Sequence, residues 1–248
     1  MRNPRIYQAQ AFEVGQSQAL NDDAFGHIVR VLRLKNGDDI TLFNGVAEQA
    51  GYFEYQAKLV NVGKKSADVE IIAKELVANE SPLNIHLAQG ISRGDRMDFT
   101  LQKSVELGVN TITPIFTERC GVKLSGERLE KKHQQWQKIV NSACEQSGRC
   151  AVPIVAAPIY LDQWLQQEST ALKLNLHPKA EHSIMSLPIE NQRVRLLIGP
   201  EGGLSDDEIA SANTAGFHDV LLGPRVLRTE TAALTAITAL QCRYGDLN

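Results

Sequence analysis

Apolar and polar residues alternate along the first part of the chain, and this period of two predicts β-strands. Turn residues separate the alternating stretches, which are 38–45, 51–63 and 67–76. Residues 24–34 differ, because their apolar positions are spaced for one face of a helix. Those positions are Ile28, Val31 and Leu32. The pattern therefore predicts a small β-rich domain, a compact barrel, at the start of the chain.

From residue 85 onward, short apolar runs alternate with longer segments of helical period. The runs predict strands at 85–89, 111–116, 153–157, 171–178, 194–199 and 220–223. The longer segments predict helices at 95–108, 126–147, 161–167, from Ser205 onward and at 231–242. This alternation is typical of an α/β domain with a mostly parallel sheet. The polar segment around Pro82 separates the two predicted domains, which span residues 1–76 and 77–248.

Composition adds the properties of an ordinary globular protein. The 248 residues are 43% hydrophobic and 22% charged, and the net charge is −3. No apolar run approaches the roughly 20 residues that span a bilayer, so we expect no membrane segment. The four cysteines show no metal-ligand spacing and predict reduced thiols, a cytoplasmic location and no metal site. Any basic surface for nucleic acid must be local, because the whole chain is slightly acidic.

Two Gly-Pro corners suggest where a ligand binds. Apolar runs end in Gly199-Pro200 and again in Gly223-Pro224. Ligands of open α/β sheets bind beyond the carboxyl ends of strands, and glycine has no Cβ to block the approach to the backbone. One such corner is adequately explained as a sharp exit from a strand. Two corners in successive units, with Gly202-Gly203 beside the first, favour a binding site.

The first corner does not have the composition of a phosphate cradle. Neither the G-x-G-x-x-G fingerprint nor a P-loop occurs in the sequence. Ser205 and Glu208 form a capping box, and Asp206 and Asp207 add two more acids to the same helical turn. These carboxylates already use the positive end of the helix dipole. The predicted ligand is therefore neutral, zwitterionic or cationic, and S-adenosylmethionine fits this description.

The second corner leads into a segment with two interpretations. Arg225, Arg228, Thr229, Glu230 and Thr231 follow it within a few residues. Arginine and hydroxyl groups at a strand end suit a substrate with phosphates or carbonyls. Alternatively, the threonine caps the last helix and the glutamate complements its dipole. The residues alone favour neither interpretation.

The last predicted helix is apolar nearly all round. Between residues 231 and 240 its only polar side chains are three threonines. Such a helix is buried on more than one side. A subunit interface supplies the second side in one interpretation, and burial within a single chain supplies it in the other.

Longer motifs resemble a known family. "LIGPEGGLSDDEI" and "LGPRVLRTETAA" are similar to the SPOUT class of knotted methyltransferases, and more narrowly to bacterial 16S ribosomal RNA (uracil-N3)-methyltransferases. Weaker matches follow the family's order along nearly the whole chain. They are "HIVRVLRLKNGDDITLFNG" (27–45), "QKSVELGVNTITPIFTERC" (102–120) and "SACEQSGRCAVP" (142–153).

The resemblance implies a fold, a reaction and partners. The second domain would be a SPOUT-type trefoil-knotted parallel sheet, preceded by a PUA-like barrel that helps to hold RNA. The protein would be a homodimer that methylates N3 of a uridine in 16S ribosomal RNA, free or assembled in the small subunit. S-adenosylmethionine would lie between loops 175–178, 199–203 and 222–231. The implied cofactor-binding residues are Leu176, His177, Gly199, Glu201, Gly202, Gly203, Leu222, Gly223, Leu227, Arg228 and Thr231.

Three residues are candidates for catalytic roles. Arg228 would neutralise charge that develops on the uracil, or fix the uracil carbonyl groups. Glu230 is the nearest candidate base, with complementation of the helix dipole as the alternative. Glu201 would contact the sulfonium or a neighbouring arginine, with a purely structural role in the turn as the alternative. His177 is expected beside the cofactor and not as a base.

The first domain carries the candidate RNA contacts. They are Arg2, Arg5, Arg30, Arg33 and Lys35, which would bind phosphates. The alternative is that they are ordinary surface cations. Two other classes of function remain open: a non-catalytic RNA-binding or ribosome-assembly protein with a SPOUT-like fold, and an α/β enzyme for a small metabolite. The β-rich domain with its local arginines favours an RNA substrate over a small metabolite.

Overall fold

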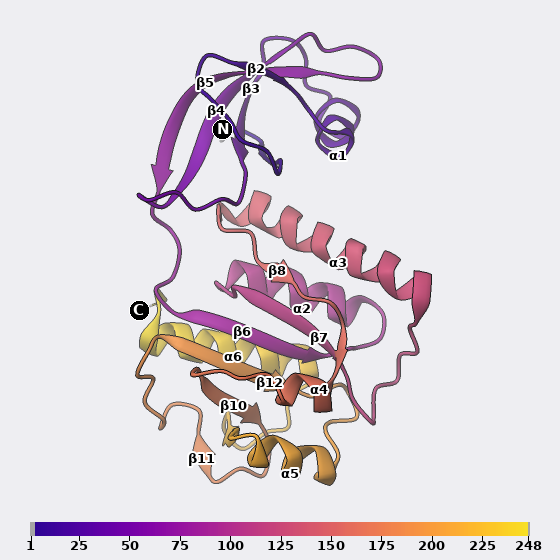
Figure 1. Ribbon diagram of the computed structural model, residues 1–248, viewed down its shortest axis with the longest axis vertical. Helices are drawn as coiled ribbons and strands as arrows, with labels where there is room; N and C mark the ends of the chain where they lie inside the picture. The colour runs from indigo at the N-terminus through magenta and orange to yellow at the C-terminus, as the bar shows by residue number, and fades with distance from the viewer. Residues whose placement is uncertain (1–2, 248) are drawn as a thin grey trace. The chain divides into compact units, whose positions relative to one another are not determined.

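The computed structural model describes residues 3–247 and divides into two compact units (Figure 1). The first unit comprises the chain up to Glu80 together with Cys144–Val152. The second unit comprises Ser81–Ala143 and the chain from Pro153 onward. The second unit contains both Gly-Pro corners.

A five-stranded sheet forms the described part of the first unit, in the order β1-β3-β4-β5-β2. The strands are β1 Arg5–Tyr7, β2 Ser17–Ala19, β3 Asp39–Phe43, β4 Tyr52–Val60 and β5 Asp68–Val77. The alternation that predicted β4 is visible in its burial, because Tyr55, Ala57 and Leu59 face the core. Only β1 and β3 run parallel among the paired strands of this sheet. The prediction of a β-rich first domain is confirmed.

The helical segment of this unit differs from its predicted form. A short helix α1 (Asp22–Phe25) continues into a π-helix η1 (Gly26–Val31). Leu32 N donates to His27 O at 2.9 Å, a bond that spans five residues and widens the turn. Ile28 is buried as expected, but Val31 is 66% and Leu32 is 38% exposed. The expectation of one shared apolar face is wrong, because the wider turn rotates the last two positions away from the core.

An eight-stranded parallel sheet forms the core of the second unit as far as residue 247. Its order is β11-β13-β10-β12-β6-β7-β8, and β9 pairs with β7 beside this path. The strands are β6 Asn84–Gly90, β7 Thr111–Phe116, β8 Ile154–Val155, β9 Ile159–Tyr160, β10 Leu172–Leu176, β11 His182–Ser183, β12 Arg193–Ile198 and β13 His218–Leu221. Every pairing in this sheet is parallel. The carboxyl ends of β13, β10, β12, β6 and β7 therefore follow one another along one edge.

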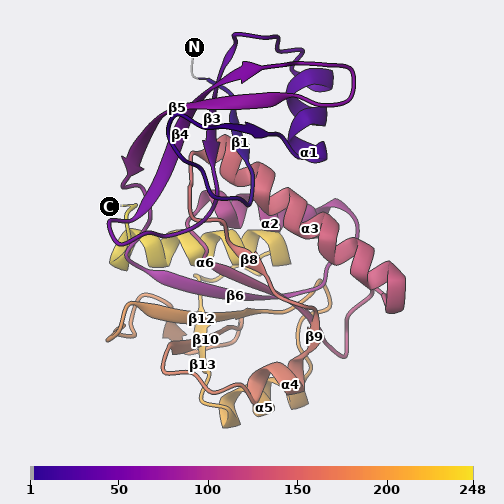
Figure 2. The same cartoon turned by 45° about the horizontal axis from the view of Figure 1, so that its top comes forward.

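Helices cover both faces of this sheet (Figure 2). They are α2 Asp95–Glu106, α3 Gly126–Ser147, α4 Leu161–Leu165, α5 Asp206–Thr214 and α6 Thr229–Tyr244. The pair α2 and α6 lies on one face, and the pair α4 and α5 lies on the other. Ser205 caps α5 in the predicted capping box with Glu208. The predicted α/β class and parallel sheet are confirmed, and the trefoil knot that the resemblance implies stays a prediction.

Further expectations concern the membrane and the thiols. None of the helices in residues 3–247 combines the length and apolar character needed to cross a bilayer. The four cysteines all lie within the described residues and are free thiols, as predicted. Burial raises the pKa of Cys144 to about 12 and that of Cys150 to about 11, so both remain protonated near neutral pH.

His86, on strand β6 of the second unit, is held in its neutral form. Burial, and then the charge of Arg195, lowers the pKa of His86 to about 4. Its Nε2 lies 2.7 Å from Thr113 Oγ1, and its ring meets Trp164 edge to face at 5.6 Å. The Arg195 guanidinium stacks on the same tryptophan, 3.9 Å from the centroid of the Trp164 ring. The fold therefore opposes protonation of His86.

This depression predicts a loss of stability in mild acid. The unfolded chain protonates His86 near pH 6.5, whereas the folded chain does so only near pH 4. Stability is complete above pH 6.5 and falls as the pH drops toward 4, by roughly 2 to 3 kcal/mol for this group. Urea unfolding of His86→Gln should show less loss of stability between pH 7.5 and 4.5 than the wild type. His218→Gln, at an exposed position, is the matched control and should retain the full loss.

Candidate functional site

Three loops meet where β10, β12 and β13 end, and they enclose a cavity of about 380 Å³. A smaller cavity of about 80 Å³ adjoins it. Both are lined by Leu176, His177, Pro178, Val226, Leu227 and Ala232. The strands are neighbours in the sheet, so the two corners that the sequence placed 24 residues apart face one space.

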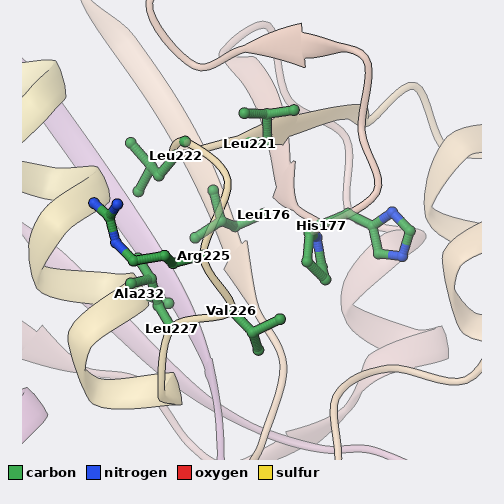
Figure 3. Close-up of a pocket in the computed structure, with 10 residues that line it drawn as sticks. Leu176, His177, Leu221, Leu222, Arg225, Val226, Leu227 and Ala232 are labelled. Atoms are coloured by element: carbon green, nitrogen blue, oxygen red, sulfur yellow. The ribbon is translucent and has the colours of Figure 1, made fainter.

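Leucines form the apolar wall of the smaller cavity. Leu176, Leu222 and Leu227 gather around the same space in Figure 3. The His177 ring lies on the far side of this group from Leu222 (Figure 3). Gly223 has a φ of +72°, a left-handed conformation in which an L side chain is strained. This wall suits a flat apolar ring system.

The first corner needs its glycines for its own packing. A Cβ on Gly199 would lie 3.1 Å from Leu204 N, and a Cβ on Gly202 would lie 3.0 Å from Arg119 Cβ. Gly203 adopts a φ of +67°. The sharp exit from the strand, offered as an alternative to a ligand site, is therefore part of the explanation. The corner also lines the larger cavity, so one glycine cluster serves both purposes.

Gly90, at the end of β6, packs closely against the backbone of the first corner. A Cβ at this position would lie 2.7 Å from Pro200 Cδ and 2.8 Å from the carbonyl carbon of Gly199. Backbone and ring atoms cannot yield to such an approach without a shift of the loop. The absence of a side chain at residue 90 therefore fixes where the first corner lies.

Thr229 joins the two corners. Its Oγ1 donates to Gly199 O at 2.6 Å and accepts from Gln89 Nε2 at 2.8 Å. The N-cap of α6 is Arg228, whose side chain forms no capping bond with the described residues. The interpretation of Thr229 as the cap of the last helix is wrong. Its hydroxyl group instead bonds to Gly199 O and to Gln89, and so links the loops that follow β12 and β13 to the end of β6.

Glu201 is engaged by arginine residues. Its Oε1 accepts from Arg93 N at 2.9 Å and from Arg96 Nη1 at 3.3 Å. The interaction with a neighbouring arginine, one of the predicted possibilities, is present in the structure. It ties the first corner to the loop that follows β6.

Three buried polar atoms at or beside the site have no partner among residues 3–247, and they are Gln89 Oε1, Asn175 Oδ1 and Glu230 Oε2. Asn175 is 1% exposed and lines the larger cavity; its Nδ2 donates to Asp219, but its Oδ1 accepts nothing. Glu230, in the first turn of α6, likewise has an unpartnered Oε2. A buried acceptor without a donor is costly, so the Oδ1 of Asn175, a residue that lines the larger cavity, is suited to a donor group of a ligand.

The structure brings most of the predicted cofactor residues together. Those that line the two cavities are Leu176, His177, Gly199, Glu201, Gly202, Gly203, Leu222, Gly223 and Leu227. Arg228 and Thr231 are exposed and do not line them, and neither does Glu230. All three flank Thr229 or Ala232, which do line the larger cavity.

One of the predicted RNA contacts is wrong. Arg5 is 6% exposed and donates to Glu54 Oε1 at 2.7 Å and to the carbonyl oxygens of Cys144 and Arg149. A guanidinium buried in this way cannot reach a phosphate, so it stabilises the first unit instead. Arg30, Arg33 and Lys35 are exposed. Arg2 lies outside the described residues.

Sequence reasoning missed several residues of the site. They are Gln89, Gly90 and Arg119. Gly90 directly follows the predicted strand 85–89 and was a usable signal, because it is a third glycine at the carboxyl end of a predicted strand. Asn175 lies in the predicted cofactor loop 175–178, but nothing in the sequence marked it as a binding residue. In the described range, no group of three or more His, Cys, Asp or Glu side chains could hold a metal ion.

Comparisons with known proteins match this chain to RNA methyltransferases over nearly its whole length. An RNA methyltransferase domain model matches residues 79–241, and an RNA methyltransferase PUA domain model matches residues 20–72. Ribosomal RNA small subunit methyltransferase E of Buchnera aphidicola is 40% identical over 100% of this chain and 99% of its own.

Solved structures give the same picture. A methyltransferase of Legionella pneumophila in complex with bound S-adenosylmethionine has a TM-score of 0.94 and 46% identity. Ribosomal RNA small subunit methyltransferase E of Neisseria gonorrhoeae, bound to S-adenosylmethionine, has a TM-score of 0.91 and 42% identity. Each comparison covers 100% of both chains.

Proposed function

The chain belongs to the ribosomal RNA small subunit methyltransferase E family, and on this basis we propose that it methylates N3 of a uridine in 16S ribosomal RNA. The methyl donor is S-adenosylmethionine. The observation that carries the proposal is the glycine-cornered cavity at the ends of β10, β12 and β13. Its relatives of known structure bind the same donor.

The residues of the cavity fit S-adenosylmethionine. Leu176, Leu222 and Leu227 offer an apolar slot for the adenine ring. The buried Oδ1 of Asn175 offers an acceptor for an amine or hydroxyl donor of the nucleoside. Glu201 also lines this cavity, and its Oε1 is held by Arg93 N and Arg96 Nη1. When bound, S-adenosylmethionine supplies a methyl group on a positively charged sulfur.

The residues at the start of α6 act on the uracil. N3 must lose its proton before or as it attacks the methyl carbon, and negative charge then develops on the flanking carbonyl oxygens. Arg228 neutralises this charge and orients the ring, and positioning of the two reactants supplies much of the acceleration. Glu230, in the first turn of α6, accepts the N3 proton.

The first unit holds the RNA. Arg30, Arg33 and Lys35 are exposed near the end of η1 and bind phosphates there. The match of residues 20–72 to a PUA domain of RNA methyltransferases supports this role. We also propose that the functional domains divide near residues 76 and 77, just before the first compact unit ends its main segment at Glu80. A cytoplasmic location, which we propose as well, suits access to ribosomal subunits.

A direct assay tests the proposed reaction. The purified protein is incubated with S-adenosylmethionine carrying a radiolabelled methyl group and with small ribosomal subunits from cells that lack this protein. Label should enter the subunit RNA, and mass spectrometry of its nucleosides should identify 3-methyluridine. Naked 16S ribosomal RNA and free nucleosides are tested in parallel. The absence of transfer to any RNA would contradict the proposal and favour a non-catalytic RNA-binding protein.

We further propose that the protein is a homodimer that uses the outer face of α6. Thr231 and Thr235 are exposed on this face, and Thr235 Oγ1 donates to Thr231 O at 2.7 Å. Thr238 Oγ1 donates to Leu234 O in the same way at 2.8 Å. Hydroxyl groups bonded to their own helix leave methyl groups for packing, so the face can be buried at low polar cost.

A charge on this face should break the dimer. Sedimentation velocity should give the mass of two chains for the wild type and of one chain for Thr235→Arg, because a buried unpaired arginine opposes association. Ser211→Arg, at an exposed position of α5 on the other face of the sheet, is the control and should remain dimeric. A monomeric wild type would contradict the proposal.

A further inference from the structure

A third, more open cavity of about 740 Å³ adjoins the larger of the two cavities at the glycine corners, which we call the cofactor cavity. The loops after β12, β6 and β7 form it, and these strands are neighbours in the sheet. Its lining is Arg93, Gly94, Asp95, Arg96, Arg119, Gly121, Glu201 and Gly202. Three of these residues, Arg119, Glu201 and Gly202, also line the cofactor cavity. The two cavities are therefore contiguous along the carboxyl edge of the sheet.

Two of its arginines are held in place but not neutralised. Arg93 Nε donates to Gly121 O at 3.2 Å, and Arg119 Nη1 donates to Gly202 O at 3.3 Å and Leu204 O at 3.2 Å. These acceptors are backbone carbonyl groups. Neither guanidinium pairs with a carboxylate among residues 3–247, whereas Arg96 pairs with Glu201. Each of the two retains N–H groups that can donate to an anion.

Glycines make room for both side chains. A Cβ on Gly121 would lie 2.5 Å from Arg93 Nε, and a Cβ on Gly202 would lie 3.0 Å from Arg119 Cβ. The loops after β7 and β12 thus lack side chains where the arginines lie against them. The position of the two charges is built into the loops, which distinguishes them from freely moving surface cations.

We propose that Arg93 and Arg119 bind backbone phosphates of the RNA strand on either side of the target nucleotide. This inference rests on the proposed function, because it takes RNA as the substrate. Phosphates are the anions that flank every nucleotide, and arginine forms bidentate bonds with them. A strand held at this cavity presents its base to the adjoining cofactor cavity. The contacts position the RNA and carry no information about its sequence.

The carboxylate of S-adenosylmethionine is the other anion available at this edge. It supplies one negative group, whereas two unpaired arginines stand on different loops. The leucine wall that suits the adenine ring lies at the ends of β10 and β13. Arg119 reaches the cofactor cavity, which Leu176 and Leu227 also line, whereas Arg93 lies outside that cavity. A polynucleotide therefore fits both charges better than the tail of the cofactor does.

Substitution of both arginines by glutamine tests the inference. Binding to small ribosomal subunits is measured at several salt concentrations, and binding of S-adenosylmethionine is measured by calorimetry. The Arg93→Gln/Arg119→Gln enzyme should bind subunits about tenfold more weakly at 0.15 M salt, with a lower slope of log affinity against log salt. The single variant Arg93→Gln, at a residue that does not line the cofactor cavity, should also bind subunits more weakly and should keep its affinity for S-adenosylmethionine within twofold of the wild type. Arg128→Gln, at an exposed position of α3, is the matched control and should change neither.

A conservative variant distinguishes the loss of charge from an effect of misfolding. Arg119→Lys keeps the charge but loses the paired bonds to the loop carbonyls, so it should retain most of the salt slope and lose part of the affinity. Unchanged subunit affinity and slope in the double variant would overturn the inference, as would an Arg93→Gln enzyme that loses S-adenosylmethionine binding and keeps subunit binding. Failure of the proposed function would look different, because the wild type itself would then transfer no methyl group to the RNA.

Discussion

An Arg228→Ala enzyme should lose about a hundredfold or more in kcat while its affinity for S-adenosylmethionine changes little. Arg228 is exposed and does not line the cofactor cavity, but it precedes Thr229, whose hydroxyl fixes the start of α6 against the first corner. Its charge is therefore carried on a rigid support beside the methyl donor. Removal of one preorganised group that stabilises a developing oxyanion typically costs two to three orders of magnitude in kcat. Single-turnover methyl transfer into small subunits measures this effect.

Two companion measurements sharpen the interpretation. Arg228→Lys keeps the charge without the planar fork and should recover part of the lost rate. Thermal unfolding of both variants should match the wild type, because an exposed arginine without a capping bond contributes little to folding. Near-normal turnover of Arg228→Ala would remove the assigned role.

A Gly90→Ala protein should bind S-adenosylmethionine at least about tenfold more weakly. The added methyl group would meet Pro200 and Gly199 at distances that no relaxed structure tolerates, so the first corner must move. Overpacking of this kind also costs about 1 to 3 kcal/mol of folding free energy. Calorimetry with S-adenosylmethionine and thermal unfolding measure the two effects on the same sample.

Gly26→Ala is the matched control for this prediction. Gly26 has a helical φ of −58°, and a Cβ there would meet nothing within 4 Å. The control should therefore keep full affinity and equal or slightly higher stability, since alanine restricts the unfolded chain. A folded Gly90→Ala protein with wild-type affinity would show that the position of the corner does not govern cofactor binding.

Local signals in the sequence predicted most of the fold. The strand 111–116 and the helix 126–147 have the predicted bounds. A compact apolar run defines the strand, and continuous helical periodicity between Gly126 and Gly148 defines the helix. The capping box at Ser205 fixed the start of α5 in the same way. Short strands such as β1, β2 and β11 were missed, because two or three residues carry no period.

Features that depend on distant parts of the chain could not be predicted. Arg5 looked like a surface cation, and only its pairing with Glu54 and with carbonyl groups near residue 149 explains its burial. The wider turn of η1 depends on one hydrogen bond that the sequence does not signal.

Parts of the cofactor site were likewise predictable from local motifs, and other parts depend on distant contacts. The two glycine corners were visible as motifs, and both lie at the predicted strand ends. Their contact through Thr229 and Gln89, and the support from Gly90, arise only when non-consecutive strands become neighbours. The sequence thus indicated which loops bind the ligand, and the structure adds the residues that hold those loops together.

A crystal structure of the protein with S-adenosylmethionine is the most direct test of the account. It should show the adenosine against Leu176, Leu222 and Leu227, with a donor of the nucleoside within hydrogen-bond distance of Asn175 Oδ1. The donor methyl group should point toward the cavity that Arg93 and Arg119 line. Cofactor bound at another place, with the two glycine corners filled by the protein's own side chains, would contradict the account.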